Sequence, residues 1–348
     1  MTRATDTIAV RADEEMDWPT LADHLCRHID GLDGPMVVEQ FPGGHANLTY
    51  LVRFGTRELV VRRPPLGPIP KGGHDMGREY RVLSKLHRVY DRAPEAYHFC
   101  DDEGVIGAAF LVTERRTGVV VRTDWPEAFK SVPDVERRTS FALIDGLADL
   151  HVVDAEAIGL GRLGRPQGFV ARQVSGWYQR WHAAKDKEIP AMDRLHARLE
   201  AGLPDNPTVS ILHNDYKMDN CQFRADDPDR IHSVFDWDMA TLGDPLVDLG
   251  TLLGYWTDPG EAMERGKMPA PIAGAYPRRA ELIDRYLGRT GFSAANIGWY
   301  EAFALWKTAV VVQQIFIRFK RGQTQDTRFA DYDKRVPELA AEAERILG

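Results

Sequence analysis

The chain has 348 residues, of which 43% are hydrophobic and 28% charged, enough for two lobes that each bury a substantial core. Its formal net charge of -8 argues against a nucleic-acid-binding surface, because phosphate backbones require a basic stripe that this sequence does not display. The isolated cysteines Cys26, Cys100 and Cys221 have neither zinc-site nor disulfide spacing and fit a reducing cytosol. We therefore expect a cytoplasmic location.

Neither the N-terminal residues nor the most apolar stretch of the chain favours a membrane partner. The first residues are acidic and lack the apolar run of a signal peptide. The most apolar stretch, residues 302–319, is interrupted by Lys307, Gln313, Gln314 and Arg318, so we expect no membrane span.

The first third of the chain predicts a small lobe rich in strands. Leu21, Leu25 and Ile29, spaced by four, predict an amphipathic helix ahead of it. Strands are expected at 37–41, 48–54 and 58–63, a helix at 76–89, and two strands within 105–114 around Gly107. We assign residues 1–112 to this N-terminal lobe and 113–118 to a hinge.

The rest of the chain, residues 119–348, is expected to form a mainly helical C-terminal lobe. Helical periodicity is found at residues 135–151, 170–184, 192–202, 278–290 and 299–321. The sequence contains no internal repeat and no low-complexity segment.

Gly43 and Gly44 lie between the first two expected strands. Glycine there allows backbone amides to approach phosphate oxygens, although the same pair also suits a plain hairpin turn. Asn47 is the nearby side chain that we select as a phosphate donor, with His45 and Thr49 as further candidates.

Arg62 lies at the strand position where kinases carry a lysine that contacts phosphates and pairs with a helix glutamate. Arginine keeps the charge and offers a bidentate fork, but its planar head cannot sit as lysine does. Glu79, one turn before Leu83, is the expected partner. The alternatives are that Arg62 and Glu79 are exposed surface residues, or that Arg63, on the opposite face of the strand, takes the role.

Residues 213–220 fit the pattern HxDxxxxN, which is typical of a phosphotransferase catalytic loop. In such a loop Asp215 orients and deprotonates an attacking hydroxyl, and Asn220 holds magnesium. Lys217 either neutralises charge on the transferred phosphate or is a surface lysine. His213 is interpreted as a structural brace.

A strand, a polar turn and a second strand are expected from Cys221 to Phe235. Such a hairpin would bring Asp236 beside Asn220, so that both reach the same metal ion. Asp238, two residues further on, either reaches a second magnesium ion or caps the next turn. Asp244 is expected to cap a following helix, and Asp248 is a possible brace for the catalytic loop.

Around these residues the chain resembles the aminoglycoside phosphotransferase and choline kinase-like superfamily, in particular the branch whose kinase-like module is also fused to acyl-CoA dehydrogenases. The resemblance is carried by residues 43–50, 60–65, 147–151, 211–220 and 235–250. It implies an α+β, bilobal protein-kinase-like fold with a small antiparallel-sheet N-lobe and a larger helical C-lobe. It also implies phosphate transfer from ATP, with Mg²⁺, to a hydroxyl group of a small molecule, and adenine binding by hinge backbone groups at Glu114.

The acceptor class is suggested by charge, and the acyl-CoA dehydrogenase association of the resembled branch points the same way. Residues 256–322 contain ten bases and six acids, a net charge of +4 in a chain of -8. This favours a neutral or anionic acceptor, such as a hydroxy acid or its CoA thioester, over a polycation. An aminoglycoside or amino-alcohol kinase is the alternative, and the bases could equally be scattered, solvated helix positions. The sequence leaves the oligomeric state open.

Two rival functions follow from individual residues. A catalytically silent binding module is favoured by Arg62 in place of lysine and disfavoured by the joint presence of Asp215, Asn220 and Asp236. A protein kinase is disfavoured because no Ala-Pro-Glu element follows Asp236.

Overall fold

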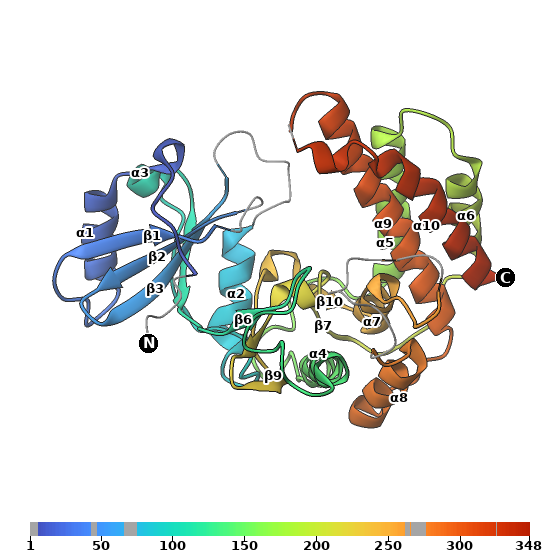
Figure 1. Ribbon diagram of the computed structural model, residues 1–348, viewed down its shortest axis with the longest axis horizontal. Coiled ribbons are helices and arrows are strands. Elements are labelled where there is room, and N and C mark those ends of the chain that lie inside the picture. Colours follow the sequence, from blue (N-terminus) through green and yellow to red (C-terminus); the bar gives the residue numbers. More distant parts are fainter. Residues whose placement is uncertain (1–5, 43–46, 66–74, 262–264, 266–275, 325) are drawn as a thin grey trace. The chain divides into compact units, whose positions relative to one another are not determined.

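The computed structural model describes residues 6–42, 47–65, 75–261, 265, 276–324 and 326–348 (Figure 1). The chain forms two compact units. The first comprises residues 1–118, 156–160 and 232–240, and the second comprises residues 119–155, 161–231 and 241–348. Two short segments thus return to the first unit from the range that we assigned by sequence to the C-terminal lobe.

The first unit is built on a five-stranded antiparallel sheet with strand order β1-β2-β3-β5-β4. Its strands are β1 (Met36–Gln40), β2 (Leu48–Phe54), β3 (Arg57–Arg63), β4 (Ala96–Cys100) and β5 (Phe110–Glu114). Alternation along β2 and β3 buries Tyr50, Val52, Leu59 and Val61. Helix α1 (Trp18–His28) packs on this core, as the four-residue spacing of its leucines predicts.

Two local features of the first unit depend on helix caps. Asp75 caps α2 (Met76–Leu86) by accepting a hydrogen bond from the backbone N–H of Arg78 at 2.8 Å. Asp102 caps α3 (Glu103–Ile106), and Gly107 ends it in the left-handed conformation at φ 77°. The expected strand before Gly107 is therefore wrong. The strand that pairs with β5 is β4, which lies earlier in the chain.

The second unit is mainly helical and contains two small sheets. Its helices are α4 (Val135–His151), α5 (Phe169–Ala184), α6 (Pro190–Ala201), α7 (Leu246–Tyr255), α8 (Arg279–Thr290), α9 (Ile297–Lys320) and α10 (Tyr332–Leu347). The short strands are β6 (Val119–Val120), β7 (Ser210–Leu212), β8 (Cys221–Arg224), β9 (Asp227–Val234) and β10 (Thr241–Gly243), with β9 ending in the first unit. The α+β fold expected from the sequence is confirmed, and so is the β8–β9 hairpin.

Helix α9 is the central helix of the second unit. It contacts α5, α6, α7 and α10, and buries Phe303, Trp306 and Val310. Among the described residues it is also the one helix long and apolar enough, by length and composition, to cross a membrane. A buried core helix meets the same criterion, and the absence of a membrane partner stays a prediction.

Candidate active site

The loop between β7 and β8 is held by a buried carboxylate of the second unit. Asp248, on α7, accepts hydrogen bonds from the backbone N–H groups of His213 (2.6 Å) and Asn214 (2.8 Å). Burial opposes ionisation of Asp248, but the hydrogen bond and charge of His151 outweigh it and hold its pKa below the usual value. The backbone N–H of Asp215 in turn donates to Nδ1 of His213 at 3.3 Å. His213 and Asp248 therefore both brace this loop.

Asn214 has a left-handed backbone conformation, with φ 66°. Glycine and asparagine adopt this conformation readily, and β-branched residues do so at a cost of about 1–2 kcal/mol. We expect Asn214→Gly to keep near-parental activity and Asn214→Val to lower both the melting temperature and kcat, because the shifted loop loses its bonds to Asp248.

Asn296→Val is the matched control, since Asn296 has φ 62° but begins α9. It should lower the melting temperature to a similar degree and leave kcat unchanged. If the two valine variants have equal kcat, the conformation of Asn214 does not matter for catalysis.

The carboxylate of Asp215 is surrounded by the other polar residues of the loop. Nζ of Lys217 lies 3.1 and 2.9 Å from its two oxygens, and the side-chain amide of Asn220 donates to Oδ2 at 3.0 Å. Burial would lower the pKa of Lys217, but the charge and hydrogen bond of Asp215, together with Tyr255 and Asp219, outweigh burial and raise it. The lysine is thus a permanent cation at the carboxylate. The loop thus brings Asp215, Lys217 and Asn220 together.

A second group of cations lies next to this loop and was not predicted as a site. Nζ of Lys307, on α9, donates to the backbone carbonyl oxygen of Asn214 at 3.2 Å and lies 5.6 Å from the ring centroid of Trp177. The guanidinium of Arg180 lies 4.4 Å from the same centroid. Burial lowers the pKa of Lys307, and the charge of Asp215 opposes this shift. The helical spacing of Trp177 and Trp181 favours packing and leaves a place beside the acceptor open, because spacing does not reveal which cations flank a ring.

In the first unit, Arg62 lies between two acids. Its guanidinium donates to Oε1 of Glu79 at 2.6 Å and also to Oδ1 of Asp236, which follows β9. Arg63 points elsewhere: it is buried and donates to the backbone carbonyls of Pro64 and Ile106. Arg62, and not Arg63, therefore makes the strand-to-helix ion pair expected from the sequence.

Asp236 and Asp238 flank a buried tryptophan in a short 3-10 turn (Trp237–Met239). Asp236 has φ 70°, and Nε1 of Trp237 donates to the backbone carbonyl of Val234 at 2.8 Å, which fixes the turn. The charges of both aspartates act on Arg62. Burial would lower the pKa of Arg62, but Glu79 and Asp236 outweigh it, and Asp238 adds to their effect. The arginine stays charged.

Burial raises the pKa of Glu79 to about 7, against the attraction of Arg62. The ordinary pKa of a glutamate is 4.5, so the folded pKa lies above the unfolded one. The stability that results is full below pH 4.5 and is lost as the pH rises through about 7.

We expect the free energy of unfolding of the ligand-free parent, relative to that of Glu79→Gln, to fall over this interval. Urea denaturation at pH 5 and pH 8 measures it, with Glu58→Gln on β3 as the control. A difference that does not change with pH would contradict the shift.

The remaining predicted site residues are Gly43, Gly44, Asn47 and Glu114. Gly43 and Gly44 lie outside the described residues. Asn47 is buried and immediately precedes β2. The backbone N–H of Glu114 donates to the carbonyl of Glu95 at 2.8 Å, and its carboxylate pairs with Arg116 at 2.9 Å. These bonds occupy the N–H and the carboxylate of Glu114, and an adenine contact by the hinge backbone stays a prediction.

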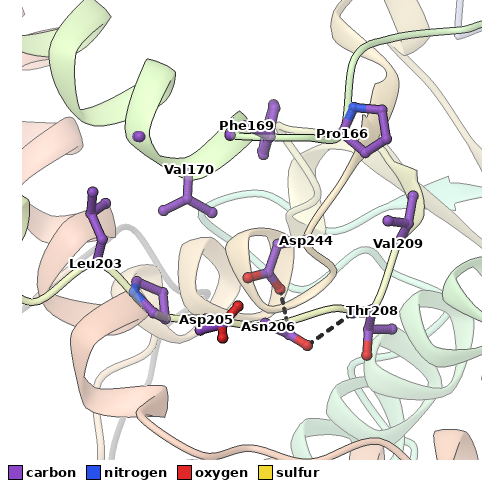
Figure 2. Close-up of a pocket in the computed structure, with 12 residues that line it drawn as sticks. Pro166, Phe169, Val170, Leu203, Asp205, Asn206, Thr208, Val209 and Asp244 are labelled. Carbon is purple, nitrogen blue, oxygen red and sulfur yellow. Dashed lines mark hydrogen bonds between the residues drawn. The ribbon is translucent and has the colours of Figure 1, made fainter.

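A pocket of about 270 Å³ in the second unit contains none of the predicted site residues (Figure 2). Phe169, Val170 and Leu203 form part of its lining. Its polar groups bond to one another: the amide of Asn206 donates to Asp244 at 2.7 Å and its oxygen accepts from the backbone of Thr208 at 3.1 Å (Figure 2). Asp244 also accepts from the backbone N–H of Leu246 at 3.0 Å, the expected cap of α7.

Comparison with known proteins gives a family match over most of the chain. Residues 37–282 match the model of the phosphotransferase enzyme family. The chain is 31% identical over 348 residues to acyl-CoA dehydrogenase family member 11 of Gallus gallus, covering 96% of this chain and 44% of that protein. It is 28% identical over 330 residues to family member 10 of Mus musculus, covering 91% and 30%. The chain thus spans less than half the length of these curated relatives.

Solved structures agree with this match. A Ralstonia eutropha protein, provisionally named an aminoglycoside phosphotransferase, has a TM-score of 0.81 at 30% identity and covers 96% of this chain and 98% of its own. Choline kinase from Cryptosporidium parvum has a TM-score of 0.64 at 10% identity, with 95% of each chain covered. The aminoglycoside phosphotransferase APH(4)-Ia, in complex with AMP-PNP and hygromycin B, has a TM-score of 0.57 at 14% identity and covers 94% and 98%. The last two show the fold alone.

Proposed function

We propose that this chain, which belongs to the phosphotransferase enzyme family, transfers the γ-phosphoryl group of ATP to a hydroxyl group of a small molecule. The observation that carries the proposal is the setting of Asp215. Its carboxylate is fixed by Lys217 and Asn220 on a loop anchored to Asp248. A binding scaffold has no need for a half-exposed carboxylate held in this way, whereas a base that orients a hydroxyl does.

Each residue has a definite role in this proposal. Asp215 accepts the proton of the acceptor hydroxyl and aligns its oxygen, and Lys217 compensates charge on the transferred group. Arg62, kept cationic by Glu79 and Asp236, binds nucleotide phosphate through its fork.

The proposed magnesium ligands are Asn220, Asp236 and Asp238. Carboxylate and amide oxygens are the donors that a hard cation prefers, and the amide nitrogen of Asn220 already faces Asp215, which leaves its oxygen for the metal. When bound, Mg²⁺ neutralises charge on the β- and γ-phosphates. Because Asp236 is paired with Arg62, metal binding has to loosen this ion pair.

Ion pairs in the second unit bear on the acceptor, because they involve the bases of residues 256–322. Of the bases in residues 256–322 that the structure describes, five form ion pairs: Arg265 with Glu301 and Glu342, Arg279 with Glu261, Arg285 with Asp145, Arg289 with Asp149, and Lys320 with Asp186. Four of these acids lie outside the segment. The segment's net charge of +4 is therefore compensated by its surroundings and does not by itself favour an anionic acceptor.

Lys307 and Arg180 give a local reason for the same acceptor class. Both flank Trp177, and Lys307 contacts the backbone one residue before Asp215. We infer that they bind a carboxylate or phosphate of the acceptor while Trp177 contacts its apolar part. The names of the curated relatives point to acyl-CoA chemistry, which supports a hydroxy acid or hydroxyacyl-CoA.

ADP release tests the proposal, measured with hydroxy acids, hydroxyacyl-CoA thioesters, choline and kanamycin as acceptors. We expect turnover of the acyl compounds. ADP release with none of the four classes would support a catalytically silent module, and preferential turnover of kanamycin would instead support an aminoglycoside kinase.

Arg180→Ala should raise the KM of the anionic acceptor by about tenfold or more and leave the KM of ATP unchanged, because a charge-assisted contact contributes about 1.5–3 kcal/mol. Lys320→Ala, which removes a cation that pairs with Asp186, is the control. An acceptor KM equal in Arg180→Ala and the control would exclude Arg180 from the acceptor site.

A further inference from the structure

Three histidines of the first unit lie together, and none of them is among the residues assigned above. His24 and His28 are one helical turn apart on α1, and His98 is on β4. Nε2 of His24 lies 2.9 Å from Nε2 of His98, and the rings of His24 and His28 are stacked with centroids 4.1 Å apart. One ring nitrogen from each residue lies within 4.8 Å of the others.

The tautomer of His28 favours metal binding. Its Nδ1 lies 2.8 Å from the backbone carbonyl oxygen of His24, and a carbonyl can only accept, so Nδ1 carries the proton. The lone pair is then on Nε2. A ligating histidine commonly donates its other ring N–H to a carbonyl in this way, which fixes the ring and increases its basicity.

We propose that His24, His28 and His98 bind a divalent transition-metal cation, with Zn²⁺ as the favoured ion. Neutral imidazoles suit zinc, copper and nickel, whereas magnesium requires oxygen ligands, so the site is chemically distinct from the proposed nucleotide metal. Nitrogens of a tetrahedral zinc site lie about 3.3 Å apart, since each is about 2.0–2.1 Å from the ion. The ring nitrogens lie within 4.8 Å of one another, so side-chain rotations would have to bring them to this spacing, and water would fill the fourth position at the exposed edge formed by His28.

The bound ion would link α1 to the sheet. His24 is buried against Phe110 of β5, with ring centroids 5.5 Å apart, so α1 and β4 would be joined at the edge of the hydrophobic core. Because the ion binds the folded state, it should raise the melting temperature of the protein. The alternative is a metal-free hydrogen bond between His24 and His98.

Calorimetry with Zn²⁺ and Co²⁺ absorption spectroscopy test the proposal on the full chain, purified without a histidine tag and stripped with chelator. We expect about one equivalent of Zn²⁺ per chain, a four-coordinate Co²⁺ spectrum, and no competition from excess Mg²⁺. His28→Ala should weaken zinc binding about tenfold or more and remove the zinc-dependent rise in melting temperature. His28 is exposed, so this variant should fold, and His98→Gln should weaken binding in the same way.

His87→Ala is the matched control. His87 also has Nδ1 against the carbonyl four residues earlier, at 2.7 Å, but it lies outside the cluster. Cys26→Ser tests whether the exposed thiol on α1 contributes. Zinc affinity that is unchanged in His28→Ala and His98→Gln, or that falls equally in His87→Ala or Cys26→Ser, would overturn the proposed site.

Discussion

Asp215→Asn is expected to lower kcat by about 10² to 10⁴, the usual contribution of a general base, while the affinity for nucleotide changes little. Asparagine keeps the size of the side chain but cannot accept the hydroxyl proton. It also removes the charge that Lys217 contacts at 2.9 Å. Steady-state kinetics with the acceptor identified by ADP release, together with nucleotide titration, separate the two effects.

Asp226→Asn is the control for this variant. Asp226 is an exposed carboxylate in the turn between β8 and β9, where it pairs with Arg224 at 3.0 Å. The substitution should leave kcat at the parental value. Turnover by Asp215→Asn at a rate close to that of this control would remove Asp215 from the chemical step.

Asp236→Ala is expected to abolish the tightening of ATP binding by Mg²⁺, because the ion loses a carboxylate ligand. Calorimetric titrations of ATP with and without Mg²⁺ measure this directly. The same change takes one of two acids from Arg62, so ATP alone should bind no more weakly than to the parent.

The left-handed backbone conformation of Asp236 makes Asp236→Asn a useful second variant beside Asp236→Ala. Alanine at φ 70° costs about 1–2 kcal/mol, whereas asparagine tolerates the left-handed region. Asp236→Asn should therefore melt near the parent and still lose most of the Mg²⁺ effect. If Mg²⁺ tightens ATP binding equally in Asp236→Asn and the parent, Asp236 is not a ligand.

Elements defined by spacing within one segment were predictable from the sequence. The strands around Arg62 and helices such as α4 and α9 follow from periods of two and 3.6 residues, which can be recognised in the sequence alone. The predicted strand before Gly107 was wrong because local caps outweighed composition: Asp102 and Gly107 make this stretch helix α3.

The candidate site divides in the same way. The contacts of Asp215 with Lys217 and Asn220 lie within six residues, and the pairing of Arg62 with Glu79 follows from the faces of one strand and one helix. Sequence spacing could predict both.

Contacts between distant segments were decided only by the tertiary structure. The sequence by itself determined the phosphotransferase motif and the residues of its loop, because these depend on local spacing, and it indicated the fold class through the family resemblance. Packing decided that Lys307 and Arg180 flank Trp177, that acids elsewhere compensate the bases of residues 256–322, and that three histidines meet. Charges and rings interact through space over a few ångströms, and the partners here are up to 140 residues apart in the chain.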